Sequence, residues 1–506
     1  MQCCSYGATA MPAVRKSKPH PAPVLAGRCE LPSMRAHVRS FALVPAGSVQ
    51  WIAEKKARDQ RLTGCPAHLW LIRGELYDLR RWAPSHPGGA EWLAWTQGTD
   101  CTVHFETHHM NIARARAVLR RFRVPTAQHQ ASEKGKEGPH APDSQAQLTD
   151  PTGASAYVWR DGDLYDTLRA EAHAAVSAGG GSNATPLMVA LSALSVAMWL
   201  HAYCVLCDAQ SLFAAAVAGY WCFVLFGVGH NYFHQANCLW RFCADFTPFS
   251  SYDWRVSHAQ SHHLYPNLGM DLEASGLEPL VSFMRNQPTN SPLVYLYWHV
   301  VSFLIGPIQV LELWWRIVTR RSALLPENLI VPAQLAVLVV CAGFGRGLLL
   351  WLTMHGVGIY LIQLVSTPLH RSEFSWTEGC EHMRARQDSF AEHTLASTEH
   401  YWSSFSARWP TLGLLLGVFV SGSFHSHVAH HLFPTLDHSR HHLVHDVLRK
   451  NCAAYGFCCD EQEISLWELV VSTVRCWCRP KGDLMYRPER AAGVQASAVG
   501  LGRKVR

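Results

Sequence analysis

Eight histidines in three clusters are the residues of this sequence most suited to chemistry. The clusters are His230 and His234, then His258, His262 and His263, and finally His427, His430 and His431. On a helix, residues three or four positions apart share a face, so each cluster could aim its imidazoles at one point. Neutral imidazole is the commonest metal ligand in proteins. We therefore predict that the three clusters form a metal site, against the alternative that some of the 30 histidines are solvated or capping residues.

A second group of histidines lies nearer the amino terminus. His86 precedes Pro87-Gly88-Gly89, which favours a sharp turn, and His108 and His109 follow Phe105 in a helical stretch. One imidazole from each of these two elements could hold a planar cofactor between them. The predicted apolar walls are Leu79, Trp82, Trp92 and Phe105. The spacing alone does not distinguish this site from ordinary loop histidines.

The composition indicates a membrane protein that carries soluble parts. Hydrophobic residues make up 48% and charged residues 16%, whereas soluble domains contain about 25% charged residues. The net charge is +6, and the basic residues are scattered or flank apolar segments, which favours membrane-surface contact and no nucleic-acid partner. The 17 cysteines have no spacing of the secreted kind, so we expect reduced thiols that face the cytosol.

Changes in composition divide the chain into five segments. Residues 1–62 are an irregular basic leader without a secretory signal, in which residues 49–61 allow a short helix. Residues 63–125 have short strand-like runs and tight turns, typical of a compact soluble domain. Residues 126–154 are polar and rich in helix breakers, which predicts a flexible linker. Residues 155–480 contain the membrane-length apolar runs, and residues 481–506 form a basic tail.

Two hairpins of apolar segments are predicted to position the three clusters. The runs that begin at Pro186 and Ser211 are each long enough to cross a bilayer, and the second ends next to His230. Residues 329–344 and 347–365 form the second predicted hairpin. These four crossings return the chain to the same face, so all eight clustered histidines meet on one side of the membrane.

Two further apolar runs are predicted not to cross the membrane. Residues 295–315 contain Pro307 and run into a basic cluster at Arg316 to Arg321, which favours an interfacial or re-entrant segment on the cytosolic side. Residues 411–420 are too short to span a bilayer.

The residues around His86 and His109 resemble the cytochrome b5 domain. The resemblance is carried by His86-Pro87-Gly88-Gly89, by Gly98-Thr99-Asp100, and by Phe105 with His109. It implies a haem b whose axial ligands are His86 and His109, because in fused b5 domains of desaturases the second histidine lies four residues after the phenylalanine. Two axial histidines leave no open iron position, which implies electron transfer rather than oxygen activation.

The three histidine clusters resemble the histidine boxes of the membrane fatty acid desaturase and hydroxylase superfamily. A single zinc takes four ligands, so eight imidazoles suit two metals better. The Glu-x-x-His pattern of soluble di-iron bundles is absent from the apolar spans. The resemblance covers about residues 155–480 and implies two non-haem irons, with O2 as co-substrate and all eight clustered histidines as catalytic metal ligands.

Three short runs are similar to the desaturase-like b5 fusions of arthropods. They are residues 88–93, residues 256–259 and residues 430–435. Two features depart from the usual pattern. The second cluster has three residues before its histidine pair where many desaturases have two, a spacing also met in hydroxylases. The third cluster begins with His427 where front-end desaturases carry glutamine.

A ninth metal ligand is expected near the end of the last transmembrane segment, because the superfamily often uses one there. His370 occupies that position, and His425, His393 and His400 are the alternatives.

These observations predict an N-terminal α+β cytochrome b5-like domain followed by an all-α, multi-pass membrane domain with about four transmembrane helices. The expected function is that of a desaturase-like oxidoreductase of the endoplasmic reticulum membrane, with the b5 domain and histidine boxes facing the cytosol. Its expected substrate is a fatty acyl lipid or acyl-CoA, and its expected electron donor is NADH-cytochrome b5 reductase. The alternatives are a lipid hydroxylase and a membrane-tethered b5-type electron carrier without oxygenase activity.

Overall fold

The computed structural model describes residues 48–125, 156–235, 238–268, 270–275, 293–372, 375, 389–454 and 464–478. Most of the predicted leader, the predicted linker at 126–154 and the tail at 481–506 lie outside the described residues. The short helix that the sequence allows at residues 49–61 is helix α2 (Ser48–Thr63).

A small α+β domain follows α2, as predicted. Strands β1 (Trp70–Ile72) and β2 (Glu75–Tyr77) form an antiparallel hairpin. Its turn residues Arg73 and Gly74 both have positive φ, as a two-residue hairpin turn of type I′ requires. The other elements are η1 (Ala83–Ser85), α3 (Ala90–Thr96), α4 (Thr102–His108), α5 (Ile112–Leu119) and η2 (Arg120–Phe122). Trp70, Ile72, Tyr77, Leu79 and Leu119 form the core of this domain.

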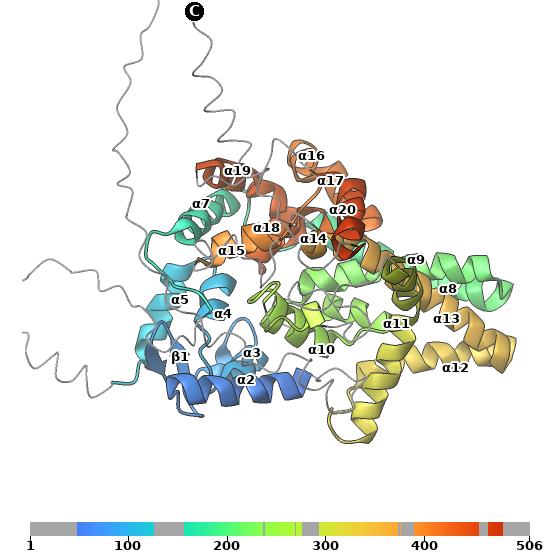
Figure 1. The fold of residues 1–506 in the computed structure, drawn as a ribbon, viewed down its shortest axis with the longest axis horizontal. Coiled ribbons are helices and arrows are strands. Elements are labelled where there is room, and N and C mark those ends of the chain that lie inside the picture. Colours follow the sequence, from blue (N-terminus) through green and yellow to red (C-terminus); the bar gives the residue numbers. More distant parts are fainter. Residues whose placement is uncertain are drawn as a thin grey trace, which may run out of the picture.

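Helix α2 joins this domain to the rest of the molecule. Buried Asp59 accepts hydrogen bonds from Lys55 Nζ at 2.5 Å and from the backbone N–H of Asp100 at 3.1 Å. On the same helix, Trp51 packs with Val256 and Leu272, which flank the second histidine cluster. Helices α2, α3 and α4 therefore lie against the part of the chain that holds the histidines (Figure 1).

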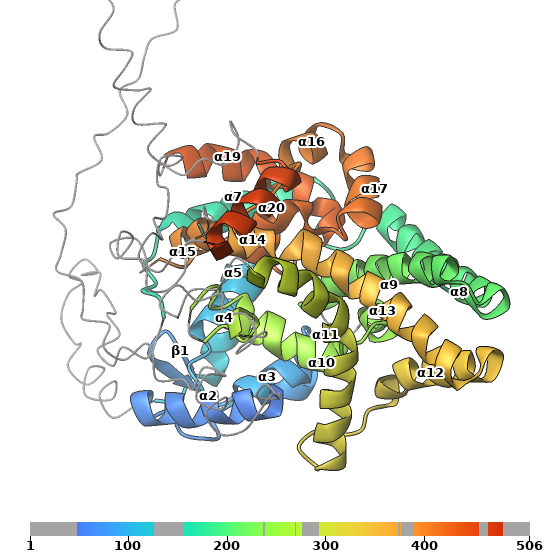
Figure 2. The ribbon, with the colours of Figure 1, turned by 45° about the vertical axis from the view of Figure 1, so that its right-hand side comes forward.

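The long apolar helices project away from the small domain (Figures 1 and 2). They are α8 (Pro186–Ala209), α9 (Leu212–Tyr232), α11 (Leu293–Val318), α12 (Ile330–Ala342) and α13 (Phe344–Ser366). Among the described residues, four segments are long and apolar enough to cross a membrane: Pro186–Ala209, Leu212–Tyr232, His299–Val318 and Phe344–Arg371. This confirms the predicted number of about four.

The four segments are not the four that the sequence analysis selected. By length α11 qualifies as a span, although we predicted an interfacial segment there, and Pro326–Ala342 is a shorter apolar helix although we predicted a crossing. Contacts nevertheless pair α12 with α13 as a hairpin beside α8 and α9. Arg346, near the start of α13, donates to the carbonyl of Gln210 in the turn between α8 and α9 at 3.0 Å. At the other end of α12, Gln334 donates to Phe246 at 3.2 Å.

Short helices cover the polar end of the bundle. In chain order they are α7 (Leu164–Ala178), η3 (Leu239–Phe246), α10 (Ser251–Trp254), η4 (Arg255–His262), η5 (Glu273–Ser275), η6 (Pro326–Leu329), α14 (Pro368–Arg371), α15 (Phe390–Ser397), α16 (Ser403–Arg408), α17 (Pro410–Val420), η8 (Phe424–Ser426), α18 (His427–Leu432), η9 (His438–Leu443), α19 (His445–Ala454) and α20 (Leu466–Cys478). A core that includes Tyr165, Leu168, Phe390 and Phe433 joins α7, α15 and the segment after α18. The chain bends by 112° between Pro410–Val420 and Phe424–Leu432.

A close backbone contact fixes the first histidine cluster relative to the third. A Cβ atom on Gly227, one turn before His230 in α9, would lie 2.6 Å from the carbonyl oxygen of Gly422. Small residues allow membrane helices to approach in this way. Gly422 itself has a φ of +55° and stands at the bend that leads into α18.

We therefore expect Gly227→Ala to destabilise the protein by about 1–3 kcal/mol, the usual cost of overpacking. Gly345→Ala is the matched control, because nothing lies within 4 Å of a Cβ atom at that position of α13. Thermal unfolding in detergent measures the difference. Equal melting temperatures for the two variants would show that this contact is not tight.

Candidate metal centre

The structure brings all three histidine clusters together in two sets of four buried residues, each with ligand atoms within 4.8 Å of one another. The first set is His230, His258, His263 and His430, and the second is His262, His370, His427 and His431. In the first set, His258 Nε2 lies 2.8 Å from His230 Nε2 and 3.0 Å from His263 Nε2. The imidazoles therefore converge through the same ring atom.

The second set has the same geometry and includes His370. Its Nε2 lies 3.1 Å from His262 Nε2 and 2.9 Å from His427 Nε2. His431 Nε2 is 3.2 Å from His427 Nε2. With metal–nitrogen bonds of about 2.1 Å, two ligands at right angles are about 3.0 Å apart, so both sets fit a metal ion.

A π-helix explains how the second cluster serves both sets. Helix η4 is a π-helix over Arg255–His262, and the N–H of His263 donates to the carbonyl of His258, five residues earlier, at 2.9 Å. The wider turn places His258 and His263 in the first set and turns His262 toward the second. A π-turn accommodates one extra residue in a helix. The unusual three-residue spacing of this cluster therefore has a structural consequence.

The expectation that each cluster aims at one point is wrong for the second and third clusters. On α18, His427 and His431 share a face and join the second set, whereas His430 points to the first set. His234 belongs to neither group of four. Its ring centre lies 4.0 Å from that of His263, and both of its ring nitrogens are buried without a hydrogen-bond partner in the described part of the chain.

Two carboxylates orient the second cluster from behind. His258 Nδ1 donates to Glu273 at 2.8 Å, and His262 Nδ1 donates to Asp271 at 3.0 Å. Hydrogen bonds of this kind leave Nε2 for a metal and make the imidazole more basic. Burial lowers the pKa of His263 well below its usual range. Burial also acts on His262, but Asp271 and Glu273 outweigh it and raise the pKa of His262.

Sequence reasoning missed Glu273, Asp271 and a second supporting pair. Asn231, next to His230, donates from Nδ2 to Asp437 at 2.7 Å and accepts from the backbone N–H of His438 at 2.9 Å. These contacts join the first cluster to the loop after the third. Asp271 and Glu273 follow the second box closely in the sequence, which is the signal that could have found them.

The three alternatives to His370 lie outside both sets. His393 Nε2 donates to the carbonyl of Pro266 at 2.7 Å. His425 and His400 line a separate pocket behind the third cluster.

His86 and His109 face each other in the small domain, with ring centres 6.1 Å apart. Their Nδ1 atoms donate to the carbonyls of Gly89 at 3.0 Å and Phe105 at 2.8 Å, which leaves both Nε2 atoms free to bind a metal. Two metal–nitrogen bonds of about 2 Å and the two ring radii give a centre-to-centre distance of about 6 Å, so the pair fits an axially ligated iron. A Cβ atom on Gly88 would lie 2.9 Å from the His86 ring, which explains the glycine.

Of the predicted walls of this cofactor site, Phe105 lies beside His109, with ring centres 4.8 Å apart. Leu79, Trp82 and Phe105 pack in the core of the small domain. Trp92 instead packs against His104, with ring centres 5.2 Å apart, and under the guanidinium of Arg255 at 4.5 Å. Trp92 is therefore part of the contact between the two domains.

That contact brings the two histidine sites close together. His108 stacks on His104, with ring centres 3.9 Å apart, and lies 5.7 Å from the ring of His234. Arg255, which is 1% exposed, donates to Glu91 at 2.5 Å across the interface. Arg169 of α7 donates to buried Glu106 at 2.8 Å. His108 therefore lies between the His86–His109 pair and the metal sets.

A cavity of about 220 Å³ opens beside the second set. His258, His262, His370 and His427 form its inner end, and its apolar lining includes Phe249, Ile305, Leu313, Ile362 and Phe424. The cavity runs between α11 and α13.

We expect Glu273→Gln to weaken metal binding roughly 10- to 100-fold, the usual effect of removing an outer-shell carboxylate. Glu171→Gln on the exposed face of α7 is the control. Metal titration with elemental analysis measures the change. Unaltered affinity in Glu273→Gln would show that the contact with His258 does not support a ligand.

The haem spectrum distinguishes the two adjacent histidines at the end of α4. His109→Ala should abolish the bis-histidine low-spin spectrum, because its Nε2 faces His86, whereas His108→Ala should retain it. Loss of the spectrum in His108→Ala alone would reverse the assignment.

Comparison with known protein families gives two matches. The model for "Fatty acid desaturase" matches residues 209–462, and the model for "Cytochrome b5-like Heme/Steroid binding domain" matches residues 57–127. Together they account for both histidine sites.

Several curated proteins are similar over most of their length. A "Cytochrome b5-related protein" of Drosophila melanogaster is 26% identical over 81% of this chain and 86% of its own. "Fatty acid desaturase 3" of Bos taurus is 24% identical, over 77% and 86% respectively. "Acyl-lipid (7-3)-desaturase" of Diacronema lutheri is 25% identical, over 80% and 87%. No solved structure is significantly similar to the chain. The chain is therefore a membrane protein that belongs to the fatty acid desaturase family and carries a fused cytochrome b5-like domain.

Proposed function

We propose that the protein is an O2-dependent desaturase of fatty acyl lipids or acyl-CoA, with a haem b and a di-iron centre in one chain. The observation that carries the proposal is the contact between the two domains at His108, next to His109, and His234, whose rings lie 5.7 Å apart. His86 and His109 would hold the haem. The two sets, with His234, would hold the irons. When bound, the irons supply the oxygen activation that removes hydrogen from an unactivated methylene.

The interface supports electron delivery within one chain. His108 is bonded directly to His109 and lies beside His234. The buried Arg255 holds Glu91, two residues after Gly89 of the haem turn, and stacks on Trp92. A fused donor in this position acts at a high local concentration without a diffusion step. The proposed source of its electrons is NADH-cytochrome b5 reductase.

The cavity beside the second set supports an acyl substrate. Residues of α11 and α13 line it, and its apolar lining would exclude water from a methylene chain near His262 and His370. The pair Arg316–Asp253, 3.0 Å apart, also lines this cavity and offers charge to a polar head group.

The proposed location is the endoplasmic reticulum membrane, with both metal sites on the cytosolic face. Arg316 lies in the last turn of α11, Arg320 and Arg321 follow the helix closely, and basic residues of this kind are enriched in cytosolic segments.

Lipid analysis of cells that express the protein tests the reaction. We expect a new double bond in an acyl chain, dependent on O2 and lost in His262→Ala. A new alcohol that likewise requires O2 and is lost in His262→Ala would identify the hydroxylase alternative. Neither product, with normal haem reduction, would identify the tethered electron carrier.

The interface predicts a separate kinetic effect of His108→Leu. Because this side chain lies between the two sites, reoxidation of the reduced haem by the di-iron centre should slow while the haem spectrum and potential stay unchanged. His68→Leu, at an exposed position of the same domain, is the control. Equal reoxidation rates in stopped-flow absorbance would exclude a role for His108 in the transfer.

A further inference from the structure

The first metal set meets the substrate cavity through fewer residues than the second set does. The cavity of about 220 Å³ is lined by three of the four histidines of the second set, but only by His258 of the first. His230, His263 and His430 are at most 1% exposed. Only one ligand of the first set therefore faces this cavity.

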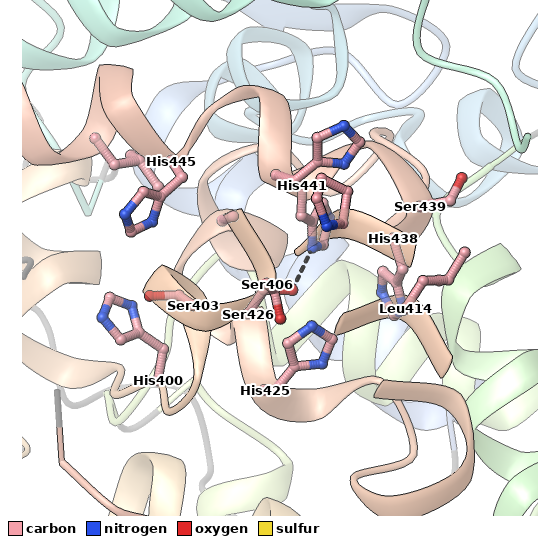
Figure 3. Close-up of a pocket in the computed structure, with 14 residues that line it drawn as sticks. His400, Ser403, Ser406, Leu414, His425, Ser426, His438, Ser439, His441 and His445 are labelled. Atoms are coloured by element: carbon pink, nitrogen blue, oxygen red, sulfur yellow. Dashed lines mark hydrogen bonds between the residues drawn. The ribbon is translucent and has the colours of Figure 1, made fainter. Parts of the chain in front are cut away.

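A second pocket lies on the other side of His430. It is lined by six histidines: His400, His425, His438, His441, His442 and His445. Figure 3 labels His400, His425, His438, His441 and His445 around the pocket, together with lining serines. Among the residues that the structure describes, the lining contains no carboxylate. Its volume is about 30 Å³, and a cavity needs only about 10–15 Å³ to hold one water, so a single ion fits.

The histidines of this pocket form a gradient of burial. His400, His442 and His445 are half-buried, whereas His425, His438 and His441 are buried. The pocket thus leads from partly exposed imidazoles to buried ones. Imidazole and hydroxyl without carboxylate suit Fe²⁺ or Zn²⁺ and do not suit Mg²⁺ or Ca²⁺.

The innermost residues reach the first metal set. Ligand atoms of His430, His438 and His441 lie within 4.8 Å of one another. His438 Nε2 is 3.2 Å from His430 Nδ1. The other nitrogen of His430, Nε2, is buried without a hydrogen-bond partner in the described ranges. His430 can therefore offer one nitrogen to each side.

Two polar contacts bear on whether the inner residues can take a metal. His438 is 4% exposed, and its Nδ1 has no hydrogen-bond partner among the described residues. That buried atom calls for a water or ion of its own, whereas the nitrogen of His438 that faces His430 is Nε2. His441 accepts from the Ser426 hydroxyl at Nδ1, 2.7 Å, and its Nε2 donates to Leu436 over a long 3.3 Å. Because that hydrogen bond is weak, a metal can replace it and bind to Nε2 of His441.

We propose that His438, His441 and Nδ1 of His430 form a transit site for a divalent transition metal, and that the histidine-lined pocket is the route by which metal enters the first set. The inference rests on the proposed function in one respect, that the first set holds a metal. An outer-shell role of His438, orienting His430 through their hydrogen bond, is the competing explanation. A route affects the rate of loading, whereas an outer-shell contact affects affinity.

The test follows iron loading of the full-length protein with its haem in place. Protein stripped of non-haem iron is mixed anaerobically with Fe²⁺, desalted at intervals and assayed for iron per haem. The variants are His441→Leu, whose hydrogen bonds go to Ser426 and Leu436 and not to the first set, and His442→Leu, at a half-buried position of the pocket. His173→Leu on α7 is the control, and the haem spectrum verifies folding.

We expect two non-haem irons per chain in the wild type and in His173→Leu. In His441→Leu and His442→Leu one iron should load at the wild-type rate and the other several-fold more slowly, with the same final occupancy. Two irons at wild-type rates in both variants would overturn the transit site. Lower final occupancy at an unchanged rate would also overturn it, in favour of an outer-shell role. A wild type that takes up no non-haem iron would instead overturn the proposed function.

Discussion

The structure depends on burying many imidazoles within hydrogen-bonding distance of one another. A buried polar atom without a partner costs free energy, and at His230, His234, His263, His427 and His431 buried ring nitrogens lack one among the described residues. Ring nitrogens that face one another at about 3 Å cannot all hold protons. Two metal ions would satisfy the Nε2 atoms that face one another in the two sets. The partnerless atoms of His230, His263, His427 and His431 are Nδ1, on the other side of each ring. The glycine contact at Gly227, the π-helix and the carboxylates behind the second cluster all serve this arrangement.

The same constraint extends to the donor domain. In the His86–His109 pair, backbone carbonyls accept hydrogen bonds from both Nδ1 atoms. The two Nε2 atoms are therefore the ones that can bind a metal between the rings. Helix α4, which ends directly before His109, carries His104 and His108. Both of these rings pack against Trp92, and His108 lies beside His234. Arg255 joins the domains from the first residue of the π-helix that carries His258 and His262. The first turn of the π-helix η4 thus connects the contact between the two domains to the metal site.

The sequence was sufficient where spacing along one element determines geometry. The three clusters, the His86–His109 pair, His370 and the number of membrane-length helices were all predicted. It was insufficient where distant segments meet. The division of the second cluster between two sets needs a π-turn, which helical periodicity does not reveal. Trp92 was assigned to the cofactor site because its apolar surface suits either place, and only docking against Arg255 decides between them. His438 is a ligand candidate only because Asn231 and Asp437 hold its loop against the first cluster.

The most direct test of the account is iron and haem content of the detergent-purified, metal-replete protein, compared with the double variant His262→Ala, His263→Ala. These two residues serve different sets, so the variant damages both at once. We predict about three irons per chain in the wild type, one of them in haem, and haem iron alone in the variant with an unchanged haem spectrum. Haem iron alone in the wild type would contradict the di-iron centre and leave a membrane-tethered electron carrier.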